Sequence, residues 1–381
     1  MTEDRSASFV ELFFDLVFVF GVTQVVSSIH GHLDWATLWR AAVVLTLLWW
    51  AWSQYTWLAG HADFDDFGPR IVILFATAGA FLTAVAVKGA WGSDGPFFGA
   101  GYFGVMALGG VFYWVRVRGT DRMQGVLIYT PQMLAGATLV LAGGFVEGDA
   151  RSWFWIGGVA ANLVAALAAG RFEFEISAAH FAERHALFVI IVLGEALIAI
   201  GVGTVGQEGT AEFYLAGTAM LGIVLGLWWS YFDWLSQVGE QQLKAATGVQ
   251  QGRLARDAYT MSHLPLIAGV ILFAVGTEEL LAHPELVLDE AARWAFLGGL
   301  ILFFGSQILM AWRLVGRMAW ERVGLIAGLA AIGSQLGAVA GVVIVGLVAA
   351  LVLAVLAAES VRFREQLRSF HQPGALGSNA N

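Results

Sequence analysis

Apolar residues form runs of about 20 along most of this chain. A helix rises about 1.5 Å per residue, so a run of that length crosses the hydrocarbon core of a bilayer. Charged, Gly-rich or Pro-containing stretches separate twelve such windows, which we predict to be transmembrane helices. The windows are residues 9–29, 35–58, 70–88, 97–115, 124–144, 153–169, 184–205, 213–235, 258–278, 293–312, 322–334 and 339–358. The pattern therefore predicts an all-α, polytopic transmembrane helix bundle.

The last two windows belong to one uninterrupted apolar run. Residues 323–358 contain no ionisable side chain over 36 positions. As a single helix they would extend about 54 Å, which is far more than the roughly 30 Å of a hydrocarbon core. The run must therefore fold back on itself, and the Gly-rich stretch 333–337 is the expected turn.

Composition agrees with a membrane protein, and the distribution of charge predicts its orientation. Hydrophobic residues make up 58% of the 381 positions and charged residues only 13%. With twelve spans, sixteen of the 20 Lys and Arg residues fall on the side of the two termini, and the opposite side keeps Arg40, Lys88, Arg151 and Arg293. By the positive-inside rule, both termini are then cytoplasmic.

A short internal similarity recurs six windows apart. The matching segments are LWW at 48–50 with WL at 57–58, and LWW at 227–229 with WL at 234–235. An even-numbered repeat leaves both halves of a membrane protein in the same orientation. We interpret the chain as two six-span halves, residues 1–175 and 176–361, followed by a cytoplasmic tail, residues 362–381.

Two carboxylates lie one helical turn apart in the first window. Glu11 and Asp15 stand at i and i+4, so both project from one face of a helix. An ionisable group inside a span costs about 2.5–3.5 kcal/mol on insertion scales, and it therefore faces a bundle interior or a water-filled cavity. A helix N-terminus at head-group level also accounts for Glu11. Asp15 lies one turn deeper, among phenylalanines, and is the stronger candidate for pairing or ion conduction.

A second charged segment, HFAERHALFVIIVLGE, covers residues 180–195. Glu183, Arg184 and His185 would form a charged collar at the cytoplasmic end of the seventh window, with or without a function. Glu195 lies near the predicted bilayer midplane and follows Gly194, which permits the close approach of another helix. We predict that Glu195 is a buried functional carboxylate and that it shares a polar cavity with Asp15.

The ninth window carries Ser262-His263-Leu264-Pro265 near its cytoplasmic end. Proline leaves backbone carbonyls one turn back without a donor, so the helix can bend there and offer ligands. Histidine titrates near neutral pH, which suits His263 to a proton relay, and a hydrogen-bonded core histidine is the alternative.

Sequence motifs for metal sites and nucleotide chemistry do not match this chain. The acidic loop HADFDD at 61–66 fits neither an EF-hand nor a zinc site, so we expect no metal and no cofactor. A phosphate-binding loop, a nucleophile elbow and an HExxH motif are missing from the sequence, which disfavours an ATP-driven role.

Four segments together resemble the bacterial low temperature requirement A (LtrA) family of integral membrane proteins. They are VELFFDLVFVFGVTQ (10–24), LWWAW (48–52) with the HADFDD loop up to Arg70, HFAERHALFVIIVLGEALIA (180–199) and SHLPLIAGVILFAVGTE (262–278). The resemblance implies a polytopic membrane protein and supplies no mechanism. A weaker similarity links Phe13-Phe14-Asp15 to the Phe-Ser-Asp motif of a family of twelve-span, two-repeat potassium channels, although Phe replaces Ser here and the seventh window lacks the matching Asp.

These features predict a secondary transporter or ion pathway that uses buried carboxylates. The candidate transport or binding residues are Glu11, Asp15, Glu183, Arg184, His185, Glu195 and His263. A membrane-embedded enzyme acting on a lipid or isoprenoid and a non-transporting accessory or sensor protein are the alternatives, and the sequence favours a non-enzymatic role. We expect a bacterial cytoplasmic membrane protein whose partners are the lipid bilayer and a small solute or ion. Nucleic acid is not an expected partner, and assembly into a homo-oligomer is left open.

Overall fold

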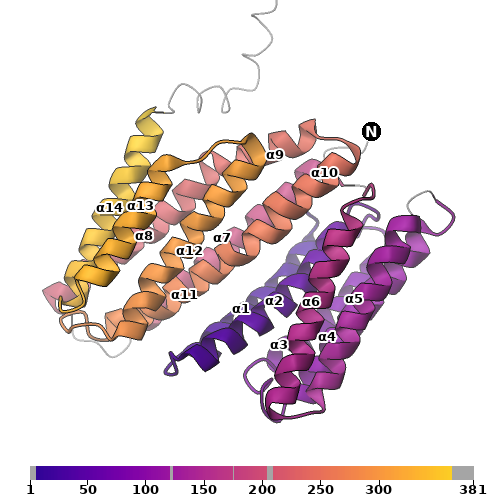
Figure 1. The fold of residues 1–381 in the computed structure, drawn as a ribbon, viewed down its shortest axis with the longest axis horizontal. Coiled ribbons are helices and arrows are strands. Elements are labelled where there is room, and N and C mark those ends of the chain that lie inside the picture. Colours follow the sequence, from indigo (N-terminus) through magenta and orange to yellow (C-terminus); the bar gives the residue numbers. More distant parts are fainter. Residues whose placement is uncertain (1–5, 121–122, 175, 204–208, 363–381) are drawn as a thin grey trace, which may run out of the picture. The chain divides into compact units, whose positions relative to one another are not determined.

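The computed structural model describes residues 6–120, 123–174, 176–203 and 209–362, and these residues form helices and no sheet (Figure 1). In chain order the helices are α1 (Phe9–Ile29), α2 (Trp35–Leu58), α3 (Phe67–Val85), α4 (Gly95–Val117), α5 (Met123–Gly144), α6 (Gly148–Ala169), α7 (Ala178–Gly203), α8 (Ala211–Phe232), α9 (Leu235–Ala245), α10 (Gly248–Leu254), the π-helix η1 (Ala255–Met261), α11 (Ser262–Ala282), α12 (Glu290–Val315), α13 (Trp320–Gln335) and α14 (Gly341–Arg362). The predicted all-α, polytopic fold is confirmed.

Each of the twelve predicted windows overlaps a helical segment, and the end of the seventh window, residues 204–205, lies outside the described residues. Within the described residues, ten helical segments are long and apolar enough to cross a membrane. Helices α2 and α13 fall outside this set. Helix α13 has only 16 residues, fewer than the roughly 20 that a hydrocarbon core requires. Helix α2 includes the polar residues Arg40, Ser53 and Gln54, which lower its mean hydropathy.

The connection between the eighth and ninth windows is more ordered than the sequence suggested. The sequence predicts a hydrophilic connection over residues 236–257. In the structure these residues contain most of α9, all of α10 and the start of η1. Helix α9 is amphipathic, and its apolar residues Leu235, Val238 and Leu243 are buried. Its periodicity of three to four residues was the available signal for a helix.

The long apolar run does fold back on itself. Helix α13 ends at Gln335 and α14 begins at Gly341, so the turn starts inside the predicted stretch 333–337. Backbone hydrogen bonds anchor the turn to the preceding loop, with Gly341 N donating to Leu286 O at 2.9 Å and Val342 N donating to Pro284 O at 2.8 Å.

The chain divides into two compact units, which we call unit 1 and unit 2. Unit 1 comprises residues 1–192 and 243–264, and unit 2 comprises residues 193–242 and 265–381. Helix α7 begins in unit 1 and ends in unit 2. The predicted six-span halves and the internal similarity behind them stay a prediction.

In unit 1, α2 is surrounded by other helices. All residues from Leu47 to Thr56 are buried, including the polar Ser53 and Gln54. A helix buried on every side lies inside a bundle rather than against lipid. Helices α1, α4 and α6 pack against α2, while α3 packs against α1 and α4, and α5 packs against α4 and α6. This central position explains why α2 can carry polar side chains.

In unit 2, α13 packs against α12 and α14, and α14 also packs against α8. Helices α11 and α12 approach each other at small residues, because a Cβ atom built on Gly276 would lie 2.4 Å from the backbone N of Phe296. Small residues at helix contacts are typical of membrane bundles, where packing replaces the hydrophobic effect as the main source of helix association.

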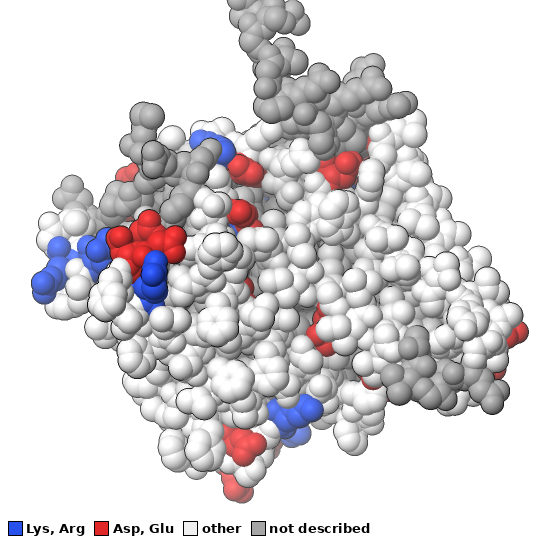
Figure 2. Space-filling model, turned by 180° about the vertical axis from the view of Figure 1, so that it is seen from behind, with Lys and Arg blue, Asp and Glu red and all other residues white. Residues whose placement is uncertain are grey.

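The outer surface carries many large apolar side chains, as a lipid environment requires. Phe75 is 68% exposed, Leu215 is 65% exposed and Leu225 is 60% exposed. On the face shown in Figure 2, most of the surface consists of uncharged residues. A soluble protein rarely exposes so much apolar surface, so the described helices fit a lipid bilayer.

Candidate functional site

Four ionisable side chains meet in the interior of unit 1, and we call them the charged cluster: Glu11 and Asp15 from α1, and His180 and Arg184 from α7. None of them is more than 2% exposed. Arg184 forms an ion pair with Asp15, and its Nη1 lies 3.6 Å from Glu11 Oε1. His180 Nε2 lies 3.0 Å from Glu11 Oε2. The guanidinium therefore bridges the two carboxylates.

Local sequence places both pairs of residues. Glu11 and Asp15 on α1, and His180 and Arg184 on α7, are each spaced four residues apart, so each pair lies on one face of its helix. Ser8 begins α1 with a capping box, in which Ser8 N donates to Glu11 Oε2 at 2.9 Å and Glu11 N donates to Ser8 Oγ at 3.4 Å. The cap orients the Glu11 carboxylate toward α7.

Trp52 from α2 closes the charged cluster on another side. Its Nε1–H donates to Asp15 Oδ1 at 2.7 Å, and its ring centroid lies 5.6 Å from the Arg184 guanidinium carbon. The ring of Phe14 lies 6.0 Å from the same carbon. Aromatic faces stabilise a desolvated cation, so these rings help to hold Arg184 in an apolar interior.

The charged cluster carries one excess negative charge when both carboxyl groups are ionised and His180 is neutral. Two carboxylates then oppose one guanidinium. Among the described residues, Glu11 Oε1, Asp15 Oδ2 and Arg184 Nε are buried without a hydrogen-bond partner. Buried polar atoms normally have partners, so these atoms mark a place for water, a proton or a ligand.

Two histidines extend the charged cluster. The ring of His185 lies 5.0 Å from the ring of Trp52 and 5.0 Å from the ring of His263, and both histidines are fully buried. His185 Nδ1 lies 2.9 Å from Phe181 O, and His263 Nδ1 lies 2.9 Å from Tyr259 O. In the tautomer that donates these bonds, Nε2 is the basic nitrogen. His185 Nε2 has no hydrogen-bond partner among the described residues.

The π-helix η1 positions His263. Pro265 has no N–H for the carbonyl of Met261, so the regular helical hydrogen bonding is interrupted there. Ser262 Oγ donates to Asp257 O at 2.7 Å and satisfies one carbonyl of the wider turn. The sequence predicted a bend at this proline, and short π-helices are common at functional sites.

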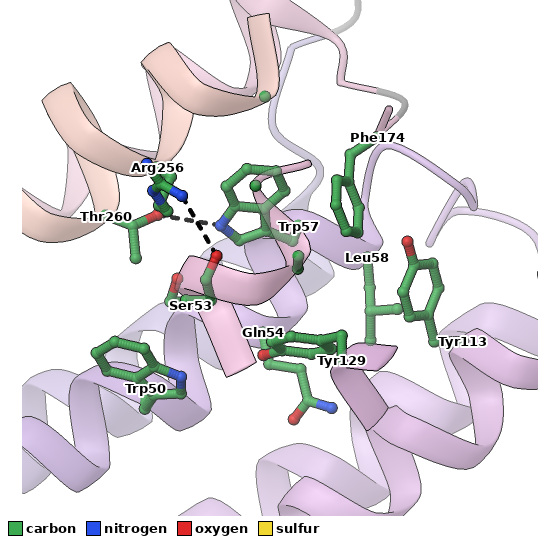
Figure 3. A pocket seen from close by; sticks show the side chains of 14 residues that line it. Trp50, Ser53, Gln54, Trp57, Leu58, Tyr113, Tyr129, Phe174, Arg256 and Thr260 are labelled. Carbon is green, nitrogen blue, oxygen red and sulfur yellow. Dashed lines mark hydrogen bonds between the residues drawn. The ribbon is translucent and has the colours of Figure 1, made fainter. Parts of the chain in front are cut away.

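A pocket lies on another face of α2 in unit 1 (Figure 3). It contains about 650 Å³ of space, part of it open to the surroundings. Aromatic side chains dominate its lining, which also includes Gln54 and Arg256; the aromatic members are Trp50, Trp57, Tyr113, Tyr129 and Phe174. A largely apolar wall with a few polar groups is typical of small-molecule sites.

Thr260 of η1 connects this pocket with the charged cluster. Trp57 Nε1–H donates to Thr260 Oγ1 at 3.0 Å (Figure 3), and Trp49 Nε1–H donates to Thr260 O at 2.8 Å. Trp49 stacks on Trp52 with ring centroids 4.7 Å apart, and Trp52 in turn binds Asp15. A continuous series of contacts therefore runs from the buried carboxylate to the pocket wall.

The remaining candidates lie elsewhere. Glu183 is half-buried and accepts a hydrogen bond from Ala7 N at 2.9 Å. Glu195 is only 4% exposed but belongs to unit 2, so the cavity that it was predicted to share with Asp15 stays a prediction.

His180 and Trp52 were not among the candidates from sequence. The signal for His180 was its position four residues before Arg184, which repeats the spacing of Glu11 and Asp15. Trp52 lay in a tryptophan-rich segment with nothing to single it out, because its partner Asp15 is 37 residues away.

Comparisons with known proteins agree with the sequence resemblance. The family described as bacterial low temperature requirement A protein (LtrA) matches residues 6–358. The "Uncharacterized protein RA0937" of Rhizobium meliloti (strain 1021) is 30% identical over 325 residues, which cover 81% of this chain and 78% of that protein. No solved structure matches this chain.

Proposed function

The chain belongs to the bacterial low temperature requirement A family of multi-span membrane proteins, and on this premise we propose that it is a proton-coupled secondary transporter. The observation that carries the proposal is the charged cluster itself, in which Glu11, Asp15 and Arg184 are fully buried between apolar helices. Ionisable residues at such positions typically belong to proton relays and ion pathways.

Stability alone does not account for the charged cluster. Replacing a buried ion pair by apolar residues of similar volume is often neutral or stabilising, by about 1–4 kcal/mol in soluble proteins. The burial of Glu11, Asp15 and Arg184 is therefore weak evidence for a purely stabilising role. Their presence favours a role in binding or transferring charge.

A proton is the ligand that best fits the imbalance of charge. Taking up one proton changes the charged cluster from one excess negative charge to neutrality, which a low-dielectric interior favours. Asp15 Oδ2 is the proposed acceptor, because Asp15 Oδ1 already binds Trp52 and Arg184. His185, whose Nε2 has no hydrogen-bond partner among the described residues, is the proposed next carrier.

The aromatic pocket is the proposed solute site. Protonation of Asp15 weakens the hydrogen bond from Trp52, and the contacts through Trp49 and Thr260 transmit that change to Trp57 in the pocket wall. Binding of a proton and of a solute would then be coupled, because each favours the same arrangement of α2 and η1.

The first prediction is that Asp15→Asn abolishes proton-coupled flux. The variant keeps the shape of the side chain but cannot exchange a proton. Purified protein in liposomes that contain a pH-sensitive dye would be screened against small organic solutes and monovalent ions under an imposed pH gradient. We expect wild-type liposomes to show solute-dependent proton movement and Asp15→Asn liposomes to match empty ones.

Asp34→Asn is the matched control. Asp34 is exposed and caps α2 through a 2.8 Å hydrogen bond from Thr37 N, and Asn caps a helix equally well. Full flux in a well-folded Asp15→Asn protein would overturn the proposal. Wild-type protein that moves neither protons nor solutes but modifies a lipid would instead favour the alternative of a membrane-embedded enzyme.

A further inference from the structure

A second pocket lies in unit 2, at the end where α8, α12 and α14 finish and α13 begins. It contains about 1130 Å³ of space, part of it open to the surroundings. None of its lining residues belongs to the charged cluster or to the aromatic pocket of unit 1. The proposed transport function therefore leaves this site unexplained.

A buried polar network forms the floor of the pocket. Arg322 is 6% exposed, its Nε donates to Glu359 Oε1 at 3.1 Å, and its Nη2 donates to Ser230 O at 3.1 Å. Its Nη1 donates to Gln307, which in turn donates to Ser230 Oγ at 3.1 Å. The guanidinium of Arg322 on α13 thus bonds to groups on α8, α12 and α14, and each of its three nitrogens donates to a protein acceptor.

The rim of the pocket offers one further cation. Arg362 forms an ion pair with Glu321, whereas Arg317 is exposed and has no ion pair among the described residues. Arg317 follows Gly316, whose φ of +68° ends α12 in the left-handed conformation that glycine adopts readily. The turn places Arg317 in the pocket lining, where its guanidinium can bind an anion.

Tryptophans place the rim at the membrane surface. Trp229 and Trp320 line the pocket and are 46% and 71% exposed. Indole rings concentrate at the boundary between hydrocarbon and head groups. Helices α12 and α14 are candidate spans that end here, and α8 also ends here, so the pocket opens at the level of lipid phosphates.

The charges of the lining distinguish between kinds of head group. The lining contains three arginines and three acids, which are Arg317, Arg322, Arg362, Asp233, Glu321 and Glu359. This balance disfavours a polyanion and matches a zwitterion, which carries a phosphate and an ammonium group together. A free phosphate would make no use of the tryptophans.

We propose that this pocket binds the head group of a zwitterionic membrane phospholipid of the phosphatidylethanolamine type. Arg317 binds the phosphate through charge-assisted hydrogen bonds. Glu321, which also pairs with Arg362, is the carboxylate assigned to the ammonium group, and Trp320 and Met318 contact the glycerol and the first carbons of the acyl chains. The site does not depend on the transport mechanism.

The second prediction concerns lipid-dependent stability of the purified, delipidated full chain. We expect added phosphatidylethanolamine to raise the midpoint of thermal unfolding of the wild-type protein. Arg317→Gln should need about tenfold more lipid for a half-maximal shift, because it loses a charged contact with the phosphate. Arg317→Lys should recover part of the difference. Arg313→Gln, which removes the same charge from α12 outside the pocket lining, should behave like the wild type.

Three results would overturn the proposal. The first is an equal shift with inorganic phosphate alone, which would indicate a free-anion site. The second is an equal or larger shift with phosphatidylglycerol, which would exclude recognition of the ammonium group. The third is an equal lipid response in Arg317→Gln and Arg313→Gln, which would indicate general attraction to the bilayer. Native mass spectrometry of the wild-type protein with the same lipids provides a second readout, in which retained phosphatidylethanolamine is expected and its absence contradicts the site.

Discussion

Arg184 is a fully buried guanidinium that lies between two fully buried carboxylates. Each charge in this arrangement depends on the others, because the surrounding helices offer little solvation. Removing one partner of a buried ion pair leaves an uncompensated charge and typically costs about 3–5 kcal/mol. An exposed pair such as Arg70 and Asp65, with a separation of 3.6 Å and side chains 48% and 59% exposed, is typically worth about 1 kcal/mol or less.

The third prediction follows from that difference. We expect Arg184→Gln to lower the free energy of unfolding by about 3–5 kcal/mol and Arg70→Gln to lower it by at most about 1 kcal/mol. The double variant Arg184→Gln with Asp15→Asn should recover part of the loss, because Glu11 is then the one carboxylate that has lost its guanidinium partner. Unfolding in mixed detergent micelles, followed by tryptophan fluorescence, would measure all three. Equal losses at Arg184 and Arg70 would contradict the buried pairing.

At the scale of elements, helix contacts in this protein depend on where small residues lie. Gly276 of α11 leaves no room for a methyl group, since its Cβ would meet the Phe296 backbone N at 2.4 Å. Gly298 of α12 has no atom within 4 Å of an added Cβ. The two glycines occur in similar apolar sequence, and only their neighbours in space distinguish them.

The fourth prediction compares these two positions. Gly276→Ala should destabilise unit 2 by about 1–3 kcal/mol, because α11 and α12 must move apart. Gly298→Ala should be neutral or stabilising by up to about 1 kcal/mol, because alanine has the higher helix propensity. The midpoint of thermal unfolding in detergent would show the difference. A loss at Gly298→Ala as large as that at Gly276→Ala would mean that helix contact is not the cause.

At the scale of the whole molecule, the distribution of positive charge predicts an orientation that remains open to test. Sixteen of the 20 Lys and Arg residues fall on the side of the termini if all twelve helical windows cross the membrane. The loop between α4 and α5 is then cytoplasmic, and the loop between α11 and α12 lies on the opposite side.

The fifth prediction uses the natural absence of cysteine from this chain. Single cysteines would replace two exposed loop residues, Thr120 and Glu285. A membrane-impermeant maleimide should label Glu285→Cys in intact cells, and it should label Thr120→Cys only after the cells are permeabilised. Labelling of Thr120→Cys in intact cells would reverse the predicted orientation. Equal labelling at both sites in intact cells would place both loops on the same side and would mean an even number of spans between them, instead of the predicted five.

Several properties of this protein were readable from sequence because they depend on local information. The length of each apolar run sets the helices, since about 20 apolar residues are needed to cross a bilayer. The run 323–358 had to turn because it is too long for one span, and a turn beginning at Leu336 is what the structure contains. The i, i+4 spacing of Glu11 and Asp15 put both carboxylates on one face of α1.

Tertiary structure alone decided which residues those carboxylates meet. Arg184 and His180 lie 169 residues from their partners, and Trp52 reaches Asp15 from a third helix. Sequence patterns do not reveal such pairings in a membrane protein, because residues that face lipid and residues that face other helices are equally apolar. The same reason hid the difference between Gly276 and Gly298, and between the half-buried Glu183 and the fully buried Arg184 beside it. Helices follow from local composition, whereas the partner that each helix face packs against depends on the whole arrangement of side chains.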